Sequence, residues 1–234
     1  MLGGVVWGVG LGLVAWVLSQ PRPLLRWIAR RDPDVLFYAQ TTGRRIALTI
    51  DDGPHAVVTP MILDVLSRYR ARATFFVIGE RIGGNEELIH RILSEGHELG
   101  NHMMTDVPSI RLGDAAFGEE FLRADRLLSR FSAVKWFRPA SARYAGKMLG
   151  RIRQHGYRCA IGSVFPYDTH VPSVGFQSIF ILGKARPGSI LVLHEGDITR
   201  KRIAAVLDMV VPRLQSRAYS IVSLSELVEE QRDP

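Results

Sequence analysis

The fold is decided by the stretch Arg45-Ile46-Ala47-Leu48-Thr49-Ile50-Asp51-Asp52-Gly53-Pro54, in which a short apolar run ends in two carboxylates and a Gly-Pro turn. A run of this length, bounded by turn residues, is typical of a buried strand in a parallel sheet. Similar runs recur along the rest of the chain, and segments with helical periodicity lie between them. This repeated order of strand and helix predicts an α/β protein with a parallel sheet covered by helices.

Seven strands are expected beyond residue 44. They are Arg45–Ile50, Ala73–Ile78, His97–Asn101, Val134–Arg138, Tyr157–Gly162, Ser189–His194 and Tyr219–Leu224. The expected helices cover residues 59–70, 85–94, 114–131, 147–155, 176–185 and 199–216. Seven units in about 190 residues fit a closed or nearly closed barrel better than an open sheet. We therefore predict a distorted (β/α)7-type barrel over residues 44–228, followed by a C-terminal tail at 229–234.

The composition narrows the class of protein. The chain has 234 residues, 47% hydrophobic and 23% charged, which fits one domain and excludes a disordered or low-complexity protein. Cys159 is the only cysteine, which excludes an intramolecular disulfide and a zinc site built from thiolates. No arginine-rich stripe is interleaved with aromatic residues, so we expect no nucleic-acid partner. The sequence leaves the oligomeric state open.

The N-terminal segment differs from the rest of the chain. Residues 2–18 carry no charge, and a helix of that length spans roughly 25 Å, the lower limit for crossing a bilayer. Of the formal net charge of +7, residues 1–45 hold +4, mostly as arginines after Pro21. We expect an N-terminal hydrophobic helix over residues 1–20, as a membrane anchor or signal segment, and a basic amphipathic linker over residues 21–43 at the lipid headgroups.

Three interpretations of the first segment stay open. It is a single membrane anchor, a signal peptide cleaved near Val17-Leu18-Ser19 to give a secreted protein, or a helix packed on the protein itself. A membrane-associated location with lipid as a partner is the expectation we carry forward. The positive charges follow the apolar stretch, which by the positive-inside rule places the domain in the cytoplasm. The side of the membrane stays unresolved.

Polar side chains follow several of the expected strands. In barrels of this type the chemistry gathers at the carboxyl ends of the strands, so these side chains are expected to meet at one mouth. The candidates are Asp51, Asp52, His102, Arg138, Asp168 and His194.

Adjacent carboxylates at a strand end point in different directions. One of Asp51 and Asp52 can therefore bind a cation while the other acts as a base, although Asp-Asp-Gly-Pro is also typical of a polar turn. His102 and Asp106 are four residues apart, and both can chelate one ion if residues 103–105 form a helical turn.

His194 ends an apolar strand that should partly desolvate it. A neighbouring carboxylate, for which Asp168 is the candidate, would tune its pKa toward neutrality, as a general acid needs. Arg138 can pair with a carboxylate and hold it ionised.

The order of these motifs resembles the polysaccharide deacetylases that share a homology domain with the rhizobial nodulation deacetylase, over roughly residues 44–228. Their Thr-Phe-Asp-Asp-Gly-Pro motif reads Thr49-Ile50-Asp51-Asp52-Gly53-Pro54, and it is followed by the typical stretch Ala73–Gly79. Their Leu-x-Leu-His motif is intact at Leu191-Val192-Leu193-His194.

Three motifs depart from the family. His-Ser/Thr-x-x-His reads His102-Met103-Met104-Thr105-Asp106, so aspartate replaces the second histidine. Arg-Pro-Pro-Tyr-Gly reads Arg138-Pro139-Ala140-Ser141-Ala142, and the Asp-Trp motif is matched only by Asp168-Thr169. These departures bear on metal affinity and substrate more than on fold.

The resemblance implies a role for each residue. Asp51 is the catalytic base, Arg138 steadies it, His194 is the general acid with Asp168, and the Ser141 backbone N–H is an oxyanion donor. Asp52, His102 and Asp106 are metal ligands, for zinc or, given the Asp-His-Asp set, for manganese, iron or cobalt.

The implied reaction is metal-dependent removal of N-acetyl groups from N-acetylglucosamine-type carbohydrate, such as chitin or peptidoglycan. Two alternatives remain: a catalytically degraded, membrane-tethered carbohydrate-binding protein, supported by Asp106, and a small-molecule amide hydrolase on the same barrel. The sequence does not identify the glycan or the native metal.

Overall fold

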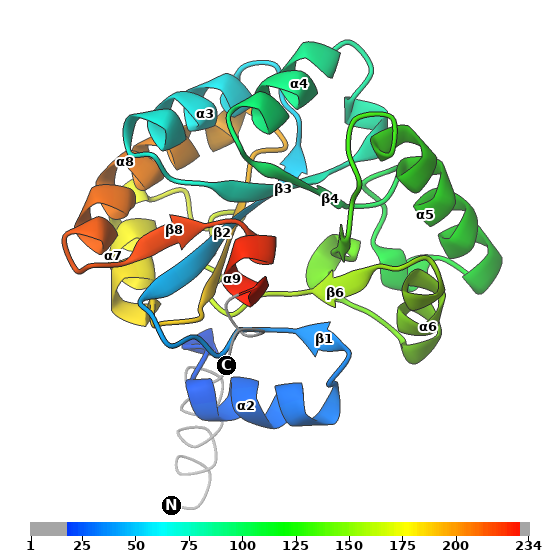
Figure 1. Cartoon of the computed structure of the whole chain (residues 1–234), viewed down its shortest axis with the longest axis horizontal. Coiled ribbons are helices and arrows are strands. Elements are labelled where there is room, and N and C mark those ends of the chain that lie inside the picture. The colour runs from blue at the N-terminus through cyan, green and yellow to red at the C-terminus, as the bar shows by residue number, and fades with distance from the viewer. Residues whose placement is uncertain (1–17, 230–234) are drawn as a thin grey trace, which may run out of the picture.

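The computed structural model describes residues 18–229 (Figure 1). The strands are β1 (Val35–Leu36), β2 (Arg45–Gly53), β3 (Ala73–Val77), β4 (Glu98–Asn101), β5 (Trp136–Phe137), β6 (Arg158–Ala160), β7 (Ile190–His194) and β8 (Ser220–Val222). The helices are α2 (Arg22–Arg31), α3 (Val58–Arg68), α4 (Glu86–Ser94), α5 (Asp114–Leu128), α6 (Gly146–Gln154), α7 (Val174–Lys184), α8 (Arg202–Gln215) and α9 (Leu224–Glu229).

The strands form one parallel sheet in the order β1-β6-β5-β4-β3-β2-β7, and β8 also pairs with β2. Val164, in the segment after β6, forms a parallel bridge to Leu191 of β7. This bridge joins the β6 side of the sheet to β7, and the sheet curls into a distorted barrel. The predicted α/β architecture is confirmed.

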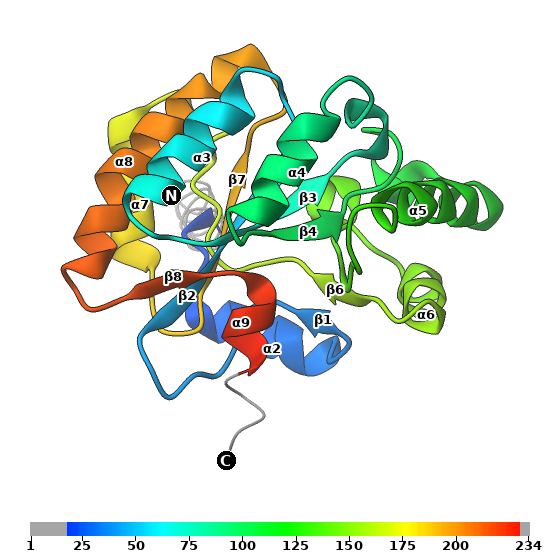
Figure 2. The same ribbon diagram turned by 45° about the horizontal axis from the view of Figure 1, so that its top comes forward.

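Both faces of β2 are buried, which explains why its sequence is a continuous apolar run. Ile46, Leu48 and Ile50 are at most 1% exposed, and Ala47 and Thr49 on the opposite face are fully buried. Helices α3, α8 and α7 lie side by side along one flank of the barrel (Figure 2). Each large apolar side chain buried in this way contributes about 1.5–3 kcal/mol to folding.

The seven expected strands all occur, most of them shorter than predicted, and the six expected helices lie within a few residues of their predicted bounds. The sheet also includes two residues that precede the barrel boundary predicted at residue 44. Val35 and Leu36, expected in a linker, pair with Cys159 and Ala160 of β6. A strand of two residues has no periodicity, so the sequence gives no signal for it.

The N-terminal hydrophobic helix expected over residues 1–20 lies almost entirely outside the described residues. The predicted basic amphipathic segment forms α2, none of whose residues is buried. Ahead of it, the Gln20 side chain donates to the Phe165 carbonyl (2.8 Å) and accepts from the Phe165 N–H (2.9 Å). Across residues 18–229, no helix is long and apolar enough to cross a membrane.

Gly188 fastens the N-terminal segment to the barrel, since its carbonyl accepts from Ala39 N–H (2.8 Å). Its φ is +79°, and a Cβ there would overlap the Ala39 carbonyl. We expect Gly188→Ala to lower the free energy of unfolding by about 1–3 kcal/mol. Gly150→Ala in α6, where nothing lies within 4 Å of an added Cβ, should be neutral or stabilising. Urea unfolding of both variants measures the difference; equal effects would contradict the assignment.

Candidate active site

Asp51 lies at the carboxyl end of β2 and is 2% exposed. Its Oδ1 accepts from Arg138 Nη1 at 2.5 Å, and its Oδ2 lies 3.9 Å from His194 Nε2. Asp52, the next residue, has φ +66°, so its carboxylate leaves the chain in a different direction. The predicted divergence of the two carboxylates is present in the structure.

Arg138 is fully buried and held by groups from several strands. Its Nε donates to the Ala160 carbonyl (2.8 Å), and its Nη1 also donates to Thr49 Oγ1 (2.8 Å). The guanidinium lies over the Phe76 ring, 4.1 Å from the centroid. Groups of β2 and β6 thus fix a buried cation against the Asp51 carboxylate.

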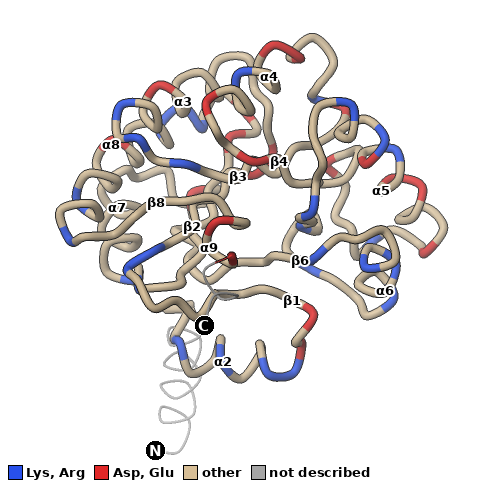
Figure 3. Tube along the Cα trace, viewed as in Figure 1, with Lys and Arg blue, Asp and Glu red and all other residues tan. Residues whose placement is uncertain are grey.

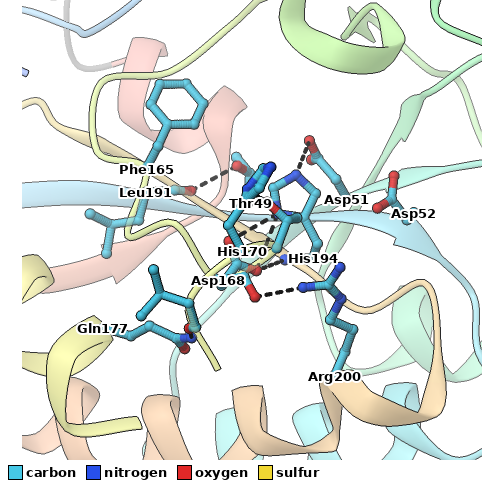
Figure 4. A network of polar contacts seen from close by, with 12 residues as sticks. Thr49, Asp51, Asp52, Phe165, Asp168, His170, Gln177, Leu191, His194 and Arg200 are labelled. Carbon is cyan, nitrogen blue, oxygen red and sulfur yellow. Dashed lines mark hydrogen bonds and ion pairs between the residues drawn. The ribbon is translucent and has the colours of Figure 1, made fainter. Parts of the chain in front are cut away.

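His194, at the end of β7, is held by Asp168 (Figure 4). Its Nδ1 lies 3.1 Å from Asp168 Oδ1, and its backbone N–H donates to Oδ2 at 2.8 Å. Burial opposes protonation of His194, but the hydrogen bond and charge of Asp168, together with the charges of Asp51 and Asp52, raise its pKa to about 9. His194 is therefore protonated at neutral pH, with Nε2 facing Asp51.

The Asp168 loop is itself anchored from the segment that follows β7. The Asp168 carbonyl accepts from Arg200 Nη1 (2.5 Å) and Arg202 Nη2 (2.7 Å). These two bonds fix the loop after β6 against the start of α8, which places the carboxylate against His194.

Asp52 and His102 form a second pair beside the first. Asp52 Oδ1 lies 3.3 Å from His102 Nε2, and His102 Nδ1 lies 2.7 Å from the Arg138 carbonyl, to which it donates. Burial would raise the pKa of Asp52, but the hydrogen bond and charge of His102, with His194 and Arg81, lower it to about 2. Burial likewise opposes protonation of His102, and the carboxylates raise its pKa nonetheless.

These two side chains fit a metal. Ligands at about 2.0–2.2 Å in a tetrahedral site lie about 3.4 Å apart, close to the separation of Asp52 Oδ1 and His102 Nε2. The Arg138 carbonyl holds Nδ1 in the protonated tautomer, which leaves Nε2 as the donor atom, a usual arrangement behind a metal-bound histidine.

Asp106, the third expected ligand, pairs with Arg81 instead. Asp106 Oδ2 lies 3.2 Å from Arg81 Nη2, its side chain is 53% exposed, and Arg81 Nη1 donates to the Asp52 carbonyl. Burial and the nearby charge of Asp52 raise the Asp106 pKa. Within residues 18–229, no group of three His, Cys, Asp or Glu side chains is arranged to hold a metal ion. Arg81 was not among the expected site residues.

The helical turn on which joint chelation by His102 and Asp106 would depend is absent, because residues 103–105 are not helical. Met103 has φ +74°, and its N–H donates to the side-chain oxygen of Asn101 (2.8 Å). This side-chain bond competes with helix formation, so four-residue spacing does not bring His102 and Asp106 onto one helical face.

Ser141 follows Arg138 and Pro139 in an unusual backbone conformation. Both Ser141 (φ +65°) and Ala142 (φ +56°) are left-handed, and Ser141 is exposed. Such conformations in residues other than glycine cluster at functional sites. The oxyanion role of its N–H stays a prediction.

The family model for polysaccharide deacetylase matches residues 38–160, more than half of the sequence. The chain belongs to the polysaccharide deacetylase family. The chain is 32% identical over 186 residues to a peptidoglycan-N-acetylglucosamine deacetylase of Bacillus cereus, which covers 78% of this chain and 87% of that protein. It is also 35% identical over 205 residues to a chitooligosaccharide deacetylase of a Bradyrhizobium strain, and the match covers 81% of this chain and 94% of that protein.

Solved structures of carbohydrate deacetylases and esterases have the same fold as this chain. A peptidoglycan N-acetylglucosamine deacetylase superposes with a TM-score of 0.80 at 26% identity, covering 84% of this chain and 93% of that one. A family 4 acetyl xylan esterase from Clostridium thermocellum, solved with a cobalt ion, gives a TM-score of 0.75 at 27% identity, covering 81% and 93%. The distorted barrel is thus the fold of known carbohydrate deacetylases and esterases.

Glu195, which directly follows His194, is a buried carboxyl beside the site that was not among the expected residues. Its side chain is fully buried between α3 and the end of β2: Oε2 accepts from Thr59 Oγ1 (2.8 Å), and a Cβ on Gly53 would overlap Oε1. Burial raises its pKa to about 8, so this carboxyl is largely neutral at neutral pH. Applied beyond the last strand residue, the strand-end rule would have found it.

We expect the pH profile of the reaction to report His194. An acid must carry its proton, so kcat/KM should fall as pH rises through about 9. Asp168→Asn removes the carboxylate that raises this pKa, and the alkaline limb should move to about 6.5 or below. Asp208→Asn, at an exposed ion pair with Arg68, is the matched control. An unchanged limb in Asp168→Asn would remove Asp168 from this role.

Glu195 generates a stability prediction. Its proton is held in the folded state up to about pH 8 but is lost from the unfolded chain near 4.5, so wild-type stability should decline between these values. Glu195→Gln does not titrate and keeps an acceptor for Thr59. Its free energy of unfolding relative to wild type should therefore rise from pH 5 to pH 8 in urea titrations. Glu119→Gln, on the exposed face of α5, should show no such trend; a pH-independent Glu195→Gln effect would contradict the buried neutral carboxyl.

Proposed function

We propose that this protein is a metal-dependent hydrolase that removes N-acetyl groups from N-acetylglucosamine-type carbohydrate. The observation that carries the proposal is the pair of Asp51 and His194, 3.9 Å apart between Oδ2 and Nε2 at adjacent strand ends. Each member has a dedicated partner behind it, Arg138 for the carboxylate and Asp168 for the imidazole. This supports a base and an acid acting on one substrate, and the named activities of the relatives agree with it.

The chain's own residues can move the protons of amide hydrolysis. Asp51, which is paired with Arg138, takes a proton from the attacking water. His194, protonated at neutral pH, donates from Nε2 to the departing nitrogen, which otherwise leaves as a very poor anion. The Ser141 N–H is proposed to donate to the oxygen that becomes negative. The products are acetate and a free amine.

A divalent ion is proposed to bind at Asp52 and His102, with Asp106 as the third ligand. When bound, such an ion polarises the acetyl carbonyl and lowers the pKa of a coordinated water. The proposal of zinc, manganese, iron or cobalt follows from the mixed carboxylate and imidazole donors.

Acetate release from chitin oligomers and from peptidoglycan fragments, with metal analysis of the purified protein, tests the proposal. Asp51→Asn and His194→Ala should each reduce kcat by about 10²–10⁴-fold while metal content and fold persist. Retention of more than a tenth of the wild-type rate would remove that residue from its role. Small acetamides, tested in parallel, would be preferred if the protein is a small-molecule amide hydrolase.

Asp106→His is the most informative change at the metal site. Two carboxylates and one imidazole give a formal ligand charge of −2, which favours manganese or iron over zinc, so a second histidine should raise zinc affinity. Calorimetric titration of the apo-protein with zinc and with manganese measures the change in affinity for each metal. Asp114→His, at an exposed aspartate paired with Arg151, is the control.

The engagement of Asp106 by Arg81 also favours the alternative of a carbohydrate-binding protein without turnover. That alternative requires that wild type binds no divalent ion and that Asp106→His gains nothing. The same titration therefore decides between the two functions.

Membrane association through residues 1–20, with lipid as a partner, is likewise our proposal, and secretion after signal cleavage is its alternative. Its support is the uncharged sequence of residues 2–18, which lies almost wholly outside the described residues. N-terminal sequencing of the protein from the membrane and soluble fractions of an expressing cell separates an intact anchor from a cleaved signal.

A further inference from the structure

A basic groove lies at the end of the barrel opposite the candidate active site. It encloses about 1220 Å³ between α2 and the segment after β1. Thr41 and Thr42, which line it, precede β2, and Pro187, which also lines it, precedes β7. These are the amino ends of the strands whose carboxyl ends hold Asp51 and His194.

Four arginines line this groove: Arg22, Arg26, Arg30 and Arg158. The first three are spaced four residues apart on α2 and therefore share one face of the helix. No acidic side chain is among the described residues that line the groove. Figure 3 shows the basic positions along α2.

The positive charges of α2 are not neutralised from within the described part of the chain. Like charges four residues apart destabilise a helix, and burial together with the charges of Arg26 and Arg186 lowers the pKa of Arg22. The nearest acids in sequence are engaged elsewhere: Asp32 accepts from the Tyr144 hydroxyl (2.8 Å), and Asp34 pairs with Arg153 (3.3 Å). Arg22, Arg26 and Arg30 share one face of α2 and have no acidic partner among the described residues, which favours an anionic ligand such as phosphate, because arginine binds phosphate with paired N–H donors.

The stretch of sequence that precedes α2 indicates which kind of molecule carries that anion. Residues 2–18, immediately before α2, carry no charge and are rich in apolar side chains. Trp27 of α2 is 52% exposed, and the Arg31 guanidinium lies over its ring at 4.0 Å. Exposed tryptophan and arginine beside an apolar stretch are typical of the headgroup region of a bilayer.

We propose that the groove binds the phosphate groups of anionic phospholipids, with α2 along the membrane surface. The catalytic mouth at the other end of the barrel then faces away from the bilayer, toward a polymer outside it. The proposal is independent of the deacetylase activity, because none of the groove residues belongs to the candidate active site.

Vesicle flotation with the full chain tests the proposal. The full chain is diluted from detergent into vesicles of phosphatidylcholine alone or with 30% phosphatidylglycerol, a composition chosen as roughly that of an anionic membrane surface. Any contribution of the apolar N-terminus is common to both vesicles and cancels in the ratio of the two affinities. The variant is Arg26→Gln with Arg30→Gln. The matched control is Arg126→Gln with Arg130→Gln, which removes two exposed arginines at the same spacing from the region of α5.

Wild type should prefer the anionic vesicles, and 0.5 M salt should abolish the preference. An arginine near an anionic surface contributes about fivefold in affinity, so the groove variant should lose about 10- to 30-fold of the preference. The control should change less than twofold, and both variants should keep wild-type acetate release from soluble oligomers. Absence of a preference in wild type, or equal losses in the two variants, overturns the proposal. Calorimetric binding of inorganic phosphate that depends on Arg26 and Arg30, without a lipid preference, also overturns it and assigns the groove to a free anion.

Discussion

The ion pair between Arg138 and Asp51 is the constraint on which the candidate active site depends. Both side chains are almost fully buried, and a buried charge is tolerated only when it is paired and hydrogen-bonded. Arg138 also donates to Thr49 of β2 and to the Ala160 carbonyl of β6. The Arg138 guanidinium therefore links β6 to β2. Loss of either partner leaves an uncompensated charge, which typically costs about 3–5 kcal/mol.

The two halves of the site follow from that pair. Arg138 holds the Asp51 carboxylate. The left-handed backbone at Asp52 directs the next carboxylate away from Asp51 and toward His102. The Arg138 carbonyl holds the imidazole of His102 from behind, so the same residue orients both the proposed base and a proposed metal ligand. On the other side, β7 pairs with β2 in a register that sets His194 opposite Asp51. The proposed acid and base are thus placed by backbone pairing, and Asp168 and Arg138 form ion pairs with them.

Asp106 stands where the family motif has its second histidine, and in this chain it pairs with Arg81. A carboxylate in place of an imidazole adds a negative charge beside Asp52, and Arg81 contacts both the Asp52 backbone and the Asp106 side chain. The cation offsets the added charge in the arrangement seen here. Whether Asp106 leaves Arg81 for a metal is a competition between two electrostatic partners, which sequence spacing alone does not resolve.

By itself the sequence determined the order of seven strands, β2 to β8, and of the six helices between them, because buried parallel strands must be continuous apolar runs and the covering helices must be amphipathic. It also determined the candidates at the mouth, since Asp51, Asp52, His102, Arg138, Asp168 and His194 all come at or after strand ends. Only the tertiary structure decided which of them meet. The pairings of Asp51 with Arg138, of His194 with Asp168 and of Asp52 with His102 join residues 26 to 87 positions apart in the sequence. Only the tertiary structure showed that β1 joins the sheet, that Arg81 pairs with Asp106 and that Glu195 packs against Gly53. Each of these features depends on a contact between segments that are distant in the sequence. The periodicity of apolar residues along the chain does not indicate such contacts.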